Sequence, residues 1–202
     1  MEKPAFWNHN AAYYPWVRKN LDRQRAANVL DVGCGEGSLC RYLAAPGRKV
    51  LGIDPDPAAV DKARERTGER EDVRFSCVPF EDYEAPGASL DGIVFVASLH
   101  HVDGEAAIRK AKALLKPGGL LLVAGLAKPG GLGDWILEGL RFLPNRIGSI
   151  LHRERTTEEL GLSVSYDFPK MTEVRLLMRR ELPGARLRWG LYSRYLLSWT
   201  KP

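Results

Sequence analysis

Three glycines alternate with other residues directly after a short apolar run, in the order Gly33, Gly35 and Gly37. Glycine lacks a Cβ, so the chain can turn sharply there and a ligand can lie against main-chain atoms. A helix that begins after such a turn adds unpaired N–H donors. Asp31 precedes the first glycine by two residues and can meet a cation. The segment therefore predicts a site for a small polar ligand.

The surrounding residues distinguish between classes of nucleotide. Ser38 stands where dinucleotide-binding sequences need their last glycine, which argues against a pyrophosphate ligand and a hydride-transferring dehydrogenase. Asp54 ends a second apolar run, and a carboxylate can accept hydrogen bonds from two hydroxyl groups at once. These residues favour a zwitterionic nucleoside. A plain strand-to-helix turn without a ligand is the alternative.

Two histidines, His100 and His101, follow the most apolar run of the chain. Histidine titrates near neutral pH and can take a proton from a hydroxyl, a thiol or a protonated amine. We expect one of them to act as a general base, with a slight preference for His101. The alternative is that the rings pack or cap the next helix.

The elements that must position these residues alternate between strand and helix. Repeated strand-helix units with short connections predict a parallel sheet with helices on both faces. Lys-Pro-Gly-Gly at 116–119 is expected to end the helix before the last of these strands. The expected strands are 29–32, 49–53, 73–77, 90–97 and 120–125, and the expected helices are 10–26, 36–45, 55–66 and 105–115.

The last third of the chain departs from this alternation. Residues 131–143 and 147–153 are expected to form helices within an insertion at 127–171, where Trp135 belongs to a broad apolar surface. A helix over 172–181, with Thr172 as its N-cap, should precede two strands, 185–189 and 194–200. These two strands would form a terminal antiparallel hairpin within the final segment, 172–202.

Composition limits the protein class. The chain has 202 residues, of which 45% are hydrophobic and 27% charged, as expected for one globular domain over 1–202. It has no signal-peptide pattern and no apolar run long enough for a membrane span. The 3 cysteines form no Cys-x-x-Cys pair. We therefore expect a cytoplasmic protein with reduced thiols and no metal site, either a monomer or a homodimer.

The positive charge is concentrated near the C-terminus. The net charge is +5, and residues 141–202 contain 12 basic and 6 acidic side chains. Such asymmetry can mark a surface for nucleic acid or membranes. A solvated arginine-rich surface is the preferred interpretation, which does not favour nucleic acid as a partner and leaves peripheral membrane contact open.

The segment Val29–Gly37, together with Asp54 and the Pro-Gly-Gly before the expected strand 120–125, resembles the class I S-adenosylmethionine-dependent methyltransferases. The similarity covers about residues 28–126, the expected cofactor-binding core. It implies an α/β fold, with a Rossmann-like, seven-stranded, mostly parallel sheet, a C-terminal antiparallel hairpin and helices on both faces. It also implies S-adenosylmethionine as cofactor and S-adenosylhomocysteine as product.

The resemblance assigns cofactor contacts to residues of this chain. The glycines, together with Asp31, Cys34 and Ala97, would border the methionine part. Asp54, next to Pro55, would take the ribose hydroxyls. Adenine would lie near Phe80 and Glu81, although Pro79 has no N–H to offer there.

Covers for the site are implied at both ends of this core. Residues 1–27 would form a helical lid, in which Tyr14 contacts the cofactor or takes part in catalysis, and Tyr13 and His9 contact the substrate. Aromatic packing of this helix on the sheet is the alternative. The insertion would cover the substrate, with Trp135 in an apolar pocket wall. A membrane-docking surface and a helix packed on the core are the other two interpretations.

The expected activity is transfer of a methyl group to oxygen, nitrogen or sulfur of a small-molecule substrate. Transfer is an in-line displacement, in which His100 or His101 can remove a proton from the acceptor. Two alternatives stay open. One is a lipid or quinone methyltransferase at the membrane surface, and the other is a regulatory protein that binds S-adenosylmethionine without catalysis.

Overall fold

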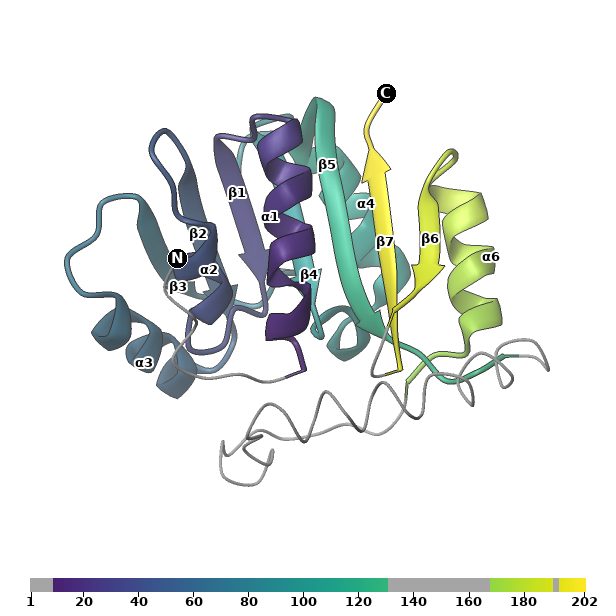
Figure 1. Ribbon diagram of the computed structural model, residues 1–202, viewed down its shortest axis with the longest axis horizontal. Coiled ribbons are helices and arrows are strands. Elements are labelled where there is room, and N and C mark those ends of the chain that lie inside the picture. Colours follow the sequence, from purple (N-terminus) through teal and green to yellow (C-terminus); the bar gives the residue numbers. More distant parts are fainter. Residues whose placement is uncertain (1–8, 131–167, 191–192) are drawn as a thin grey trace.

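A seven-stranded sheet in the order β3-β2-β1-β4-β5-β7-β6 forms the centre of the molecule (Figure 1). The computed structural model describes residues 9–130, 168–190 and 193–202. The strands are β1 (Asn28–Val32), β2 (Lys49–Asp54), β3 (Val73–Cys77), β4 (Leu90–Val96), β5 (Leu115–Leu126), β6 (Arg186–Trp189) and β7 (Arg194–Thr200). Each of the seven predicted strands is present.

Strand pairing agrees with the expected fold. β1 pairs in parallel with β2 and β4, and β2–β3 and β4–β5 are also parallel. β7 is inserted antiparallel between β5 and β6. The mostly parallel sheet with a C-terminal antiparallel hairpin is therefore confirmed.

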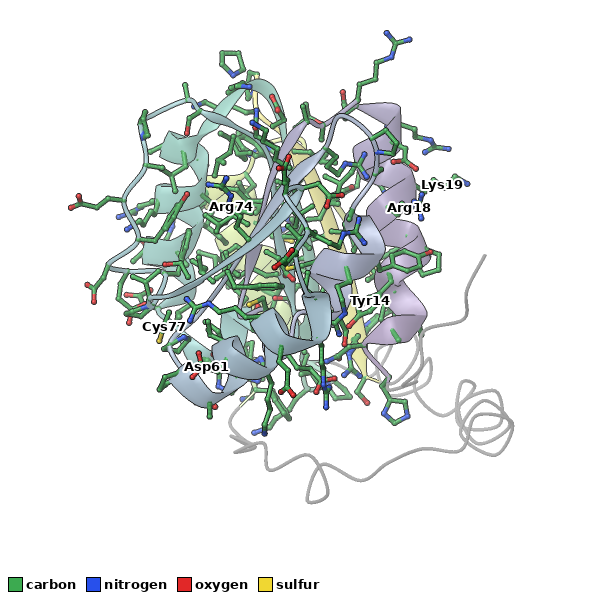
Figure 2. All side chains as sticks on the ribbon, turned by 90° about the vertical axis from the view of Figure 1, so that its left-hand side faces the viewer. Tyr14, Arg18, Lys19, Asp61, Arg74 and Cys77 are labelled. Atoms are coloured by element: carbon green, nitrogen blue, oxygen red, sulfur yellow. The ribbon has the colours of Figure 1, made fainter. Side chains whose placement is uncertain are left out.

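Helices cover both faces of the sheet. A 3-10 turn (Ala11–Tyr13), α1 (Tyr14–Arg23) and α2 (Ser38–Leu43) lie toward one face, while α4 (Gly104–Leu114) and α6 (Met171–Glu181) lie toward the other. Figure 2, turned by 90°, shows α1 and α4 on opposite sides. Alternate side chains of the central strands enter the two cores: Leu30 packs with the α4 side and Val29 with the α1 side. Burial on both faces explains why the strand sequences are almost continuously apolar.

Several expected boundaries need correction: α1 ends three residues earlier than expected, and α2 begins two residues later and ends two residues earlier. α3 (Pro57–Thr67) begins two residues later than expected, because Asp56 is its N-cap and accepts a hydrogen bond from Ala58 N at 2.9 Å. Thr172 is not the N-cap of α6: Lys170 is, and its N–H donates to the Glu173 carboxylate at 2.9 Å. Lys-Pro-Gly-Gly belongs to β5, where it makes an irregularity before parallel pairing resumes.

Some expectations fall on parts of the chain that the structure does not describe. The predicted helices 131–143 and 147–153, with Trp135, lie outside the described residues. Over the described ranges, none of the helices combines the length and apolar character needed to cross a membrane.

Candidate active site

The segment Gly33–Gly37, here named the glycine turn, joins the carboxyl end of β1 to α2. Its three glycines all have left-handed φ angles, of +72°, +52° and +75°. The N–H groups of Gly33 and Cys34 both donate to the Ile53 carbonyl, at 2.8 and 3.0 Å, which ties the turn to β2. A Cβ added to Gly35 would meet no atom within 4 Å. The turn therefore presents bare main chain to open space, as the sequence predicted.

Asp54 links the glycine turn to the end of β2. One carboxylate oxygen accepts from Gly35 N at 2.8 Å, and the other accepts from Asp56 N at 3.0 Å. The side chain is only half-buried. Each oxygen has a further lone pair, so the carboxylate can also accept two hydroxyl donors.

Asp31 is a buried carboxylate beneath the turn, with 2% of its surface exposed. Cys40 of α2 donates its thiol to Asp31 Oδ2 at 3.2 Å. Burial raises the pKa of Asp31 from 3.8 to about 7; the Cys40 hydrogen bond opposes this shift, and the charge of Asp54 adds to it. An approaching cation would favour the ionised form of this carboxyl group.

The carboxyl end of β4 meets the glycine turn. Ser98 Oγ donates to the Val32 carbonyl at 2.5 Å, and a Cβ built on Gly33 would lie 2.5 Å from Ser98 Cβ. Ala97 has a φ of +56°, a conformation that costs non-glycine residues about 1 to 2 kcal/mol, and its N–H donates to the Ala124 carbonyl at 2.9 Å. Strained backbone of this kind is concentrated at functional sites.

His100 and His101 lie one turn beyond this junction, in a 3-10 helix (Leu99–His101). Their rings are 4.0 Å apart, and the His100 ring packs edge-on against Phe168 at 5.0 Å. His101 is exposed and His100 is half-buried. Among the residues that the structure describes, His100 Nδ1 is buried without a hydrogen-bond partner. Burial, followed by the charges of His101 and Arg194, lowers the pKa of His100 from 6.5 to about 4.

Tyr13 and Tyr14 contact different elements of the fold. Tyr14 contacts Tyr42 of α2, with ring centroids 5.7 Å apart, and Figure 2 shows it where α1 meets α2. Burial and then the charge of Asp31 raise the pKa of Tyr14. Tyr13 packs with Ala124 and Leu196 of β5 and β7. Tyr14 therefore lies on the α2 side and Tyr13 beside β5 and β7.

Arg194 joins the N-terminal segment to β7, and sequence reasoning missed it. Its guanidinium is buried and donates from Nη2 to Asn10 Oδ1 at 2.5 Å, next to the half-buried His9. Nothing in the sequence distinguishes Arg194 from the other arginines of the basic C-terminal third. Its position follows from the insertion of β7 beside β5, which only the sheet order reveals.

The residues expected to border adenine differ in burial: Phe80 is buried, whereas Glu81 is exposed. Phe80 is buried and meets Phe95 edge-on at 5.4 Å, so its ring belongs to the core and only its main chain can face a ligand. Glu81 and Pro55 are exposed. Lys110 Nζ donates to the Glu81 carbonyl at 2.7 Å. Trp135, the remaining predicted substrate residue, lies outside the described residues.

These residues fit a nucleoside that carries an amino acid. The main chain at Gly35 faces open space and its N–H is bound by the Asp54 carboxylate, while Gly33, two residues earlier, lies against Ser98. The donor set comprises carboxylates and main-chain groups, which suit hydroxyl and ammonium groups. No cluster in the described ranges holds three His, Cys, Asp or Glu side chains that could bind a metal ion.

Known methyltransferases are similar to this chain in sequence. A family model described as "Methyltransferase domain" matches residues 30–123. An uncharacterized methyltransferase of Mycobacterium tuberculosis, Rv0089, is 31% identical over 205 residues, with all of both chains covered. A ubiquinone biosynthesis O-methyltransferase of Xanthomonas euvesicatoria is 41% identical over 104 residues, which is 50% of this chain and 43% of that protein.

Solved structures show the same fold. The 1,6-didemethyltoxoflavin-N1-methyltransferase of Burkholderia thailandensis, solved with 1,6-didemethyltoxoflavin and S-adenosylhomocysteine, superimposes with a TM-score of 0.61 at 19% identity. The match covers 94% of this chain and 78% of that one. With the end-to-end match to the mycobacterial methyltransferase and the open glycine turn beside Asp54, this likeness leads to one conclusion. The chain belongs to the class I S-adenosylmethionine-dependent methyltransferases.

Proposed function

We propose that this methyltransferase modifies a small-molecule acceptor bound over the carboxyl ends of β1 and β4, with His100 as the proton acceptor. The observation that carries this proposal is the position of the His100 ring, half-buried and two residues beyond the contact of Ser98 with Gly33. Ligands of open α/β sheets bind at this edge. The Burkholderia enzyme, whose structure contains 1,6-didemethyltoxoflavin, supports a small acceptor.

His100 suits this role better than His101. The lowered pKa of His100 keeps its imidazole neutral at the working pH but also makes it a weaker base than an imidazole that titrates near pH 7, so its half-buried place beside Ser98 is what favours it. The exposed His101 remains in contact with bulk water and stacks on His100. The sequence slightly favoured His101, and burial now favours His100.

The cofactor contacts are proposed from the same geometry. Bound S-adenosylmethionine supplies a methyl group on a sulfonium centre, so the protein needs to align two reactants and accept a proton. The Asp54 carboxylate would hold the ribose hydroxyls, and the glycine turn with Ala97 would border the methionine part. Main-chain groups at Phe80 and Glu81 would border adenine.

The N-terminal segment is proposed to cover this site. Tyr14 already lies against α2, close enough for the charge of Asp31 to raise its pKa, which supports contact with the cofactor side. Tyr13 packs against Leu196 of β7, and His9 adjoins Asn10, which accepts a hydrogen bond from Arg194 of β7; these positions support contact with the acceptor. Removal of residues 1–15 should then weaken cofactor binding and turnover together, whereas simple packing would mainly lower the melting temperature.

A panel of phenols, thiols and amines, assayed for S-adenosylhomocysteine release, tests the acceptor class. We expect turnover with at least one small acceptor and a loss of turnover in the double variant His100→Ala/His101→Ala at saturating cofactor. Unchanged turnover in the double variant would show that neither His100 nor His101 acts as the base. Tight cofactor binding with no turnover on any acceptor would contradict a small acceptor from these classes.

A quinone-like lipid acceptor is the second candidate. It is supported by the 41% identity to the Xanthomonas ubiquinone biosynthesis O-methyltransferase and by the basic C-terminal third. Sedimentation with anionic and with neutral vesicles separates the two candidates. Salt-sensitive binding to anionic vesicles alone would favour the lipid acceptor.

A further inference from the structure

Arg41 of α2 reaches back to the outer side of the glycine turn. Its Nη1 donates to the main-chain carbonyl of Glu36 at 2.7 Å, and to Thr67 Oγ1 of α3 at 3.4 Å. Its Nη2 donates to Ser38 Oγ at 3.3 Å. One guanidinium thus joins the turn to the beginning of α2 and the end of α3.

The Glu36 side chain is held in the same network. Its carboxylate forms an ion pair with Arg66 of α3 and accepts a hydrogen bond from Ser38 Oγ at 3.3 Å. Both the carbonyl and the carboxylate of Glu36 are therefore fixed from outside the turn. The exposed fractions of the two ion-paired side chains are 28% for Glu36 and 39% for Arg66, so the pair is partly shielded from solvent.

The inner side of the turn is held by Asp54. Its carboxylate accepts from Gly35 N, one residue before the carbonyl that Arg41 binds. A turn with three glycines has little intrinsic conformational preference, and ordering it costs more entropy than ordering other residues. Its shape therefore depends on its main-chain bonds to Ile53 and within the turn, and on side chains such as Asp54 and Arg41 that bind its main chain.

We propose that Arg41 is a positioning residue for cofactor binding, which presets the glycine turn by holding the Glu36 carbonyl opposite Asp54. Arg41 need not touch the cofactor. Preorganisation lowers the ordering cost of binding, so loss of Arg41 should weaken affinity rather than slow the chemical step. A lysine in place of Arg41 would keep the positive charge but lack the planar set of guanidinium donors, so it could replace only part of this hydrogen-bond network.

The test compares Arg41→Ala, Arg41→Lys and the matched control Arg64→Ala by calorimetric titration with S-adenosylhomocysteine. Arg64 is also a helix arginine that donates to a main-chain carbonyl, Phe75 O, at 3.3 Å, but it does not contact the turn. We expect about tenfold weaker binding for Arg41→Ala, an intermediate value for Arg41→Lys and a change below twofold for Arg64→Ala. With an acceptor, KM for S-adenosylmethionine should rise while kcat changes less than twofold.

Melting temperatures of the ligand-free variants separate positioning from a structural role. A lower melting temperature with unchanged affinity in folded Arg41→Ala would overturn the proposal, as would equal affinities of Arg41→Ala and Arg64→Ala. If Arg41→Ala does not fold, Arg41→Lys decides, because wild-type affinity in that variant would equally overturn the proposal.

Discussion

Ser98 lies against Gly33, so closely that a Cβ on the glycine would stand 2.5 Å from the serine Cβ. The Ser98 hydroxyl also donates to the carbonyl of Val32, the residue before that glycine. Ser98 precedes His100 by two residues, and Gly33 begins the glycine turn. This single contact therefore sets the distance between His100, which is proposed to face the acceptor, and the glycine turn, which is proposed to face the cofactor.

Gly33→Ala should be more destabilising than Gly47→Ala. Both positions have a left-handed φ, but a Cβ on Gly47 would meet no atom within 4 Å. We expect Gly47→Ala to lose about 1 kcal/mol of unfolding free energy through backbone strain, and Gly33→Ala a further 1 to 3 kcal/mol, roughly, through overpacking on Ser98. Urea denaturation measures both. Equal losses would mean that Ser98 moves aside without cost.

Ala97→Gly should lower turnover without lowering stability. Removing the Cβ relieves a left-handed strain of about 1 to 2 kcal/mol, against an entropy cost of about 0.5 to 1 kcal/mol, so stability should be unchanged or slightly higher. The looser junction should lower kcat several-fold. Ala88→Gly is the control, since Ala88 has a similar φ of +53° but hydrogen-bonds to Ala113 away from the site. Equal kcat in both variants would contradict a role for Ala97 in positioning.

Asp31→Asn should stabilise the ligand-free protein increasingly as pH rises. The folded pKa of Asp31 is raised to about 7, so the folded state keeps a proton that the unfolded chain releases from about pH 4 upward. The free energy of unfolding of the wild type therefore falls between about pH 4 and pH 7. That of the Asp31→Asn variant does not, because asparagine does not ionise. At about 1.4 kcal/mol per pKa unit, the gain at pH 8 could reach roughly 4 kcal/mol.

Asp72→Asn is the matched control for this pH dependence. Hydrogen bonds from Arg70 lower the pKa of the exposed Asp72, so its ionised form stabilises the folded state and the substitution should have the opposite sign. Denaturation between about pH 2.5 and pH 8 measures both variants: the loss in Asp72→Asn should be constant above about pH 4 and shrink below it, whereas the gain in Asp31→Asn should grow between about pH 4 and pH 7. A pH-independent difference between wild type and Asp31→Asn would show that Asp31 ionises normally.

The pH dependence of kcat should identify the proposed base. Because the pKa of His100 is lowered to about 4, a base at this position stays active well below pH 6.5 and is lost only as pH falls toward 4. His100→Ala should reduce kcat by about 100-fold or more, and His101→Ala by much less. An acid limb of the kcat profile that disappears in His101→Ala but persists in His100→Ala would transfer the role to His101.

Local patterns were sufficient to predict the strands of the sheet and the position of the glycine turn. The apolar run 90–97 predicted the central strand β4, and the glycine spacing predicted a turn that the structure confirms. The Lys-Pro-Gly-Gly segment was misjudged, because strand pairing can continue across an irregularity that local turn preferences do not anticipate.

Side-chain partners that come from distant elements could not be predicted. Arg41 reaches the glycine turn from within α2, and Arg194 reaches Asn10 across the whole chain. Neither position carries a periodic or spacing signal, because each partner is chosen by tertiary packing. The burial that favours His100 over His101 likewise depends on Phe168, which lies far along the sequence.

The insertion of β7 between β5 and β6 has a consequence for how the molecule is made. Chains emerge from the ribosome N-terminus first, so one edge of β5 stays unpaired until its partner β7 (Arg194–Thr200) has been synthesised. The glycine turn, Asp54 and β4 are all complete long before that. Arg194, which hydrogen-bonds to Asn10, follows them in the chain. A nascent chain would therefore form the strands around the glycine turn before the strand that ties the N-terminal segment to the sheet.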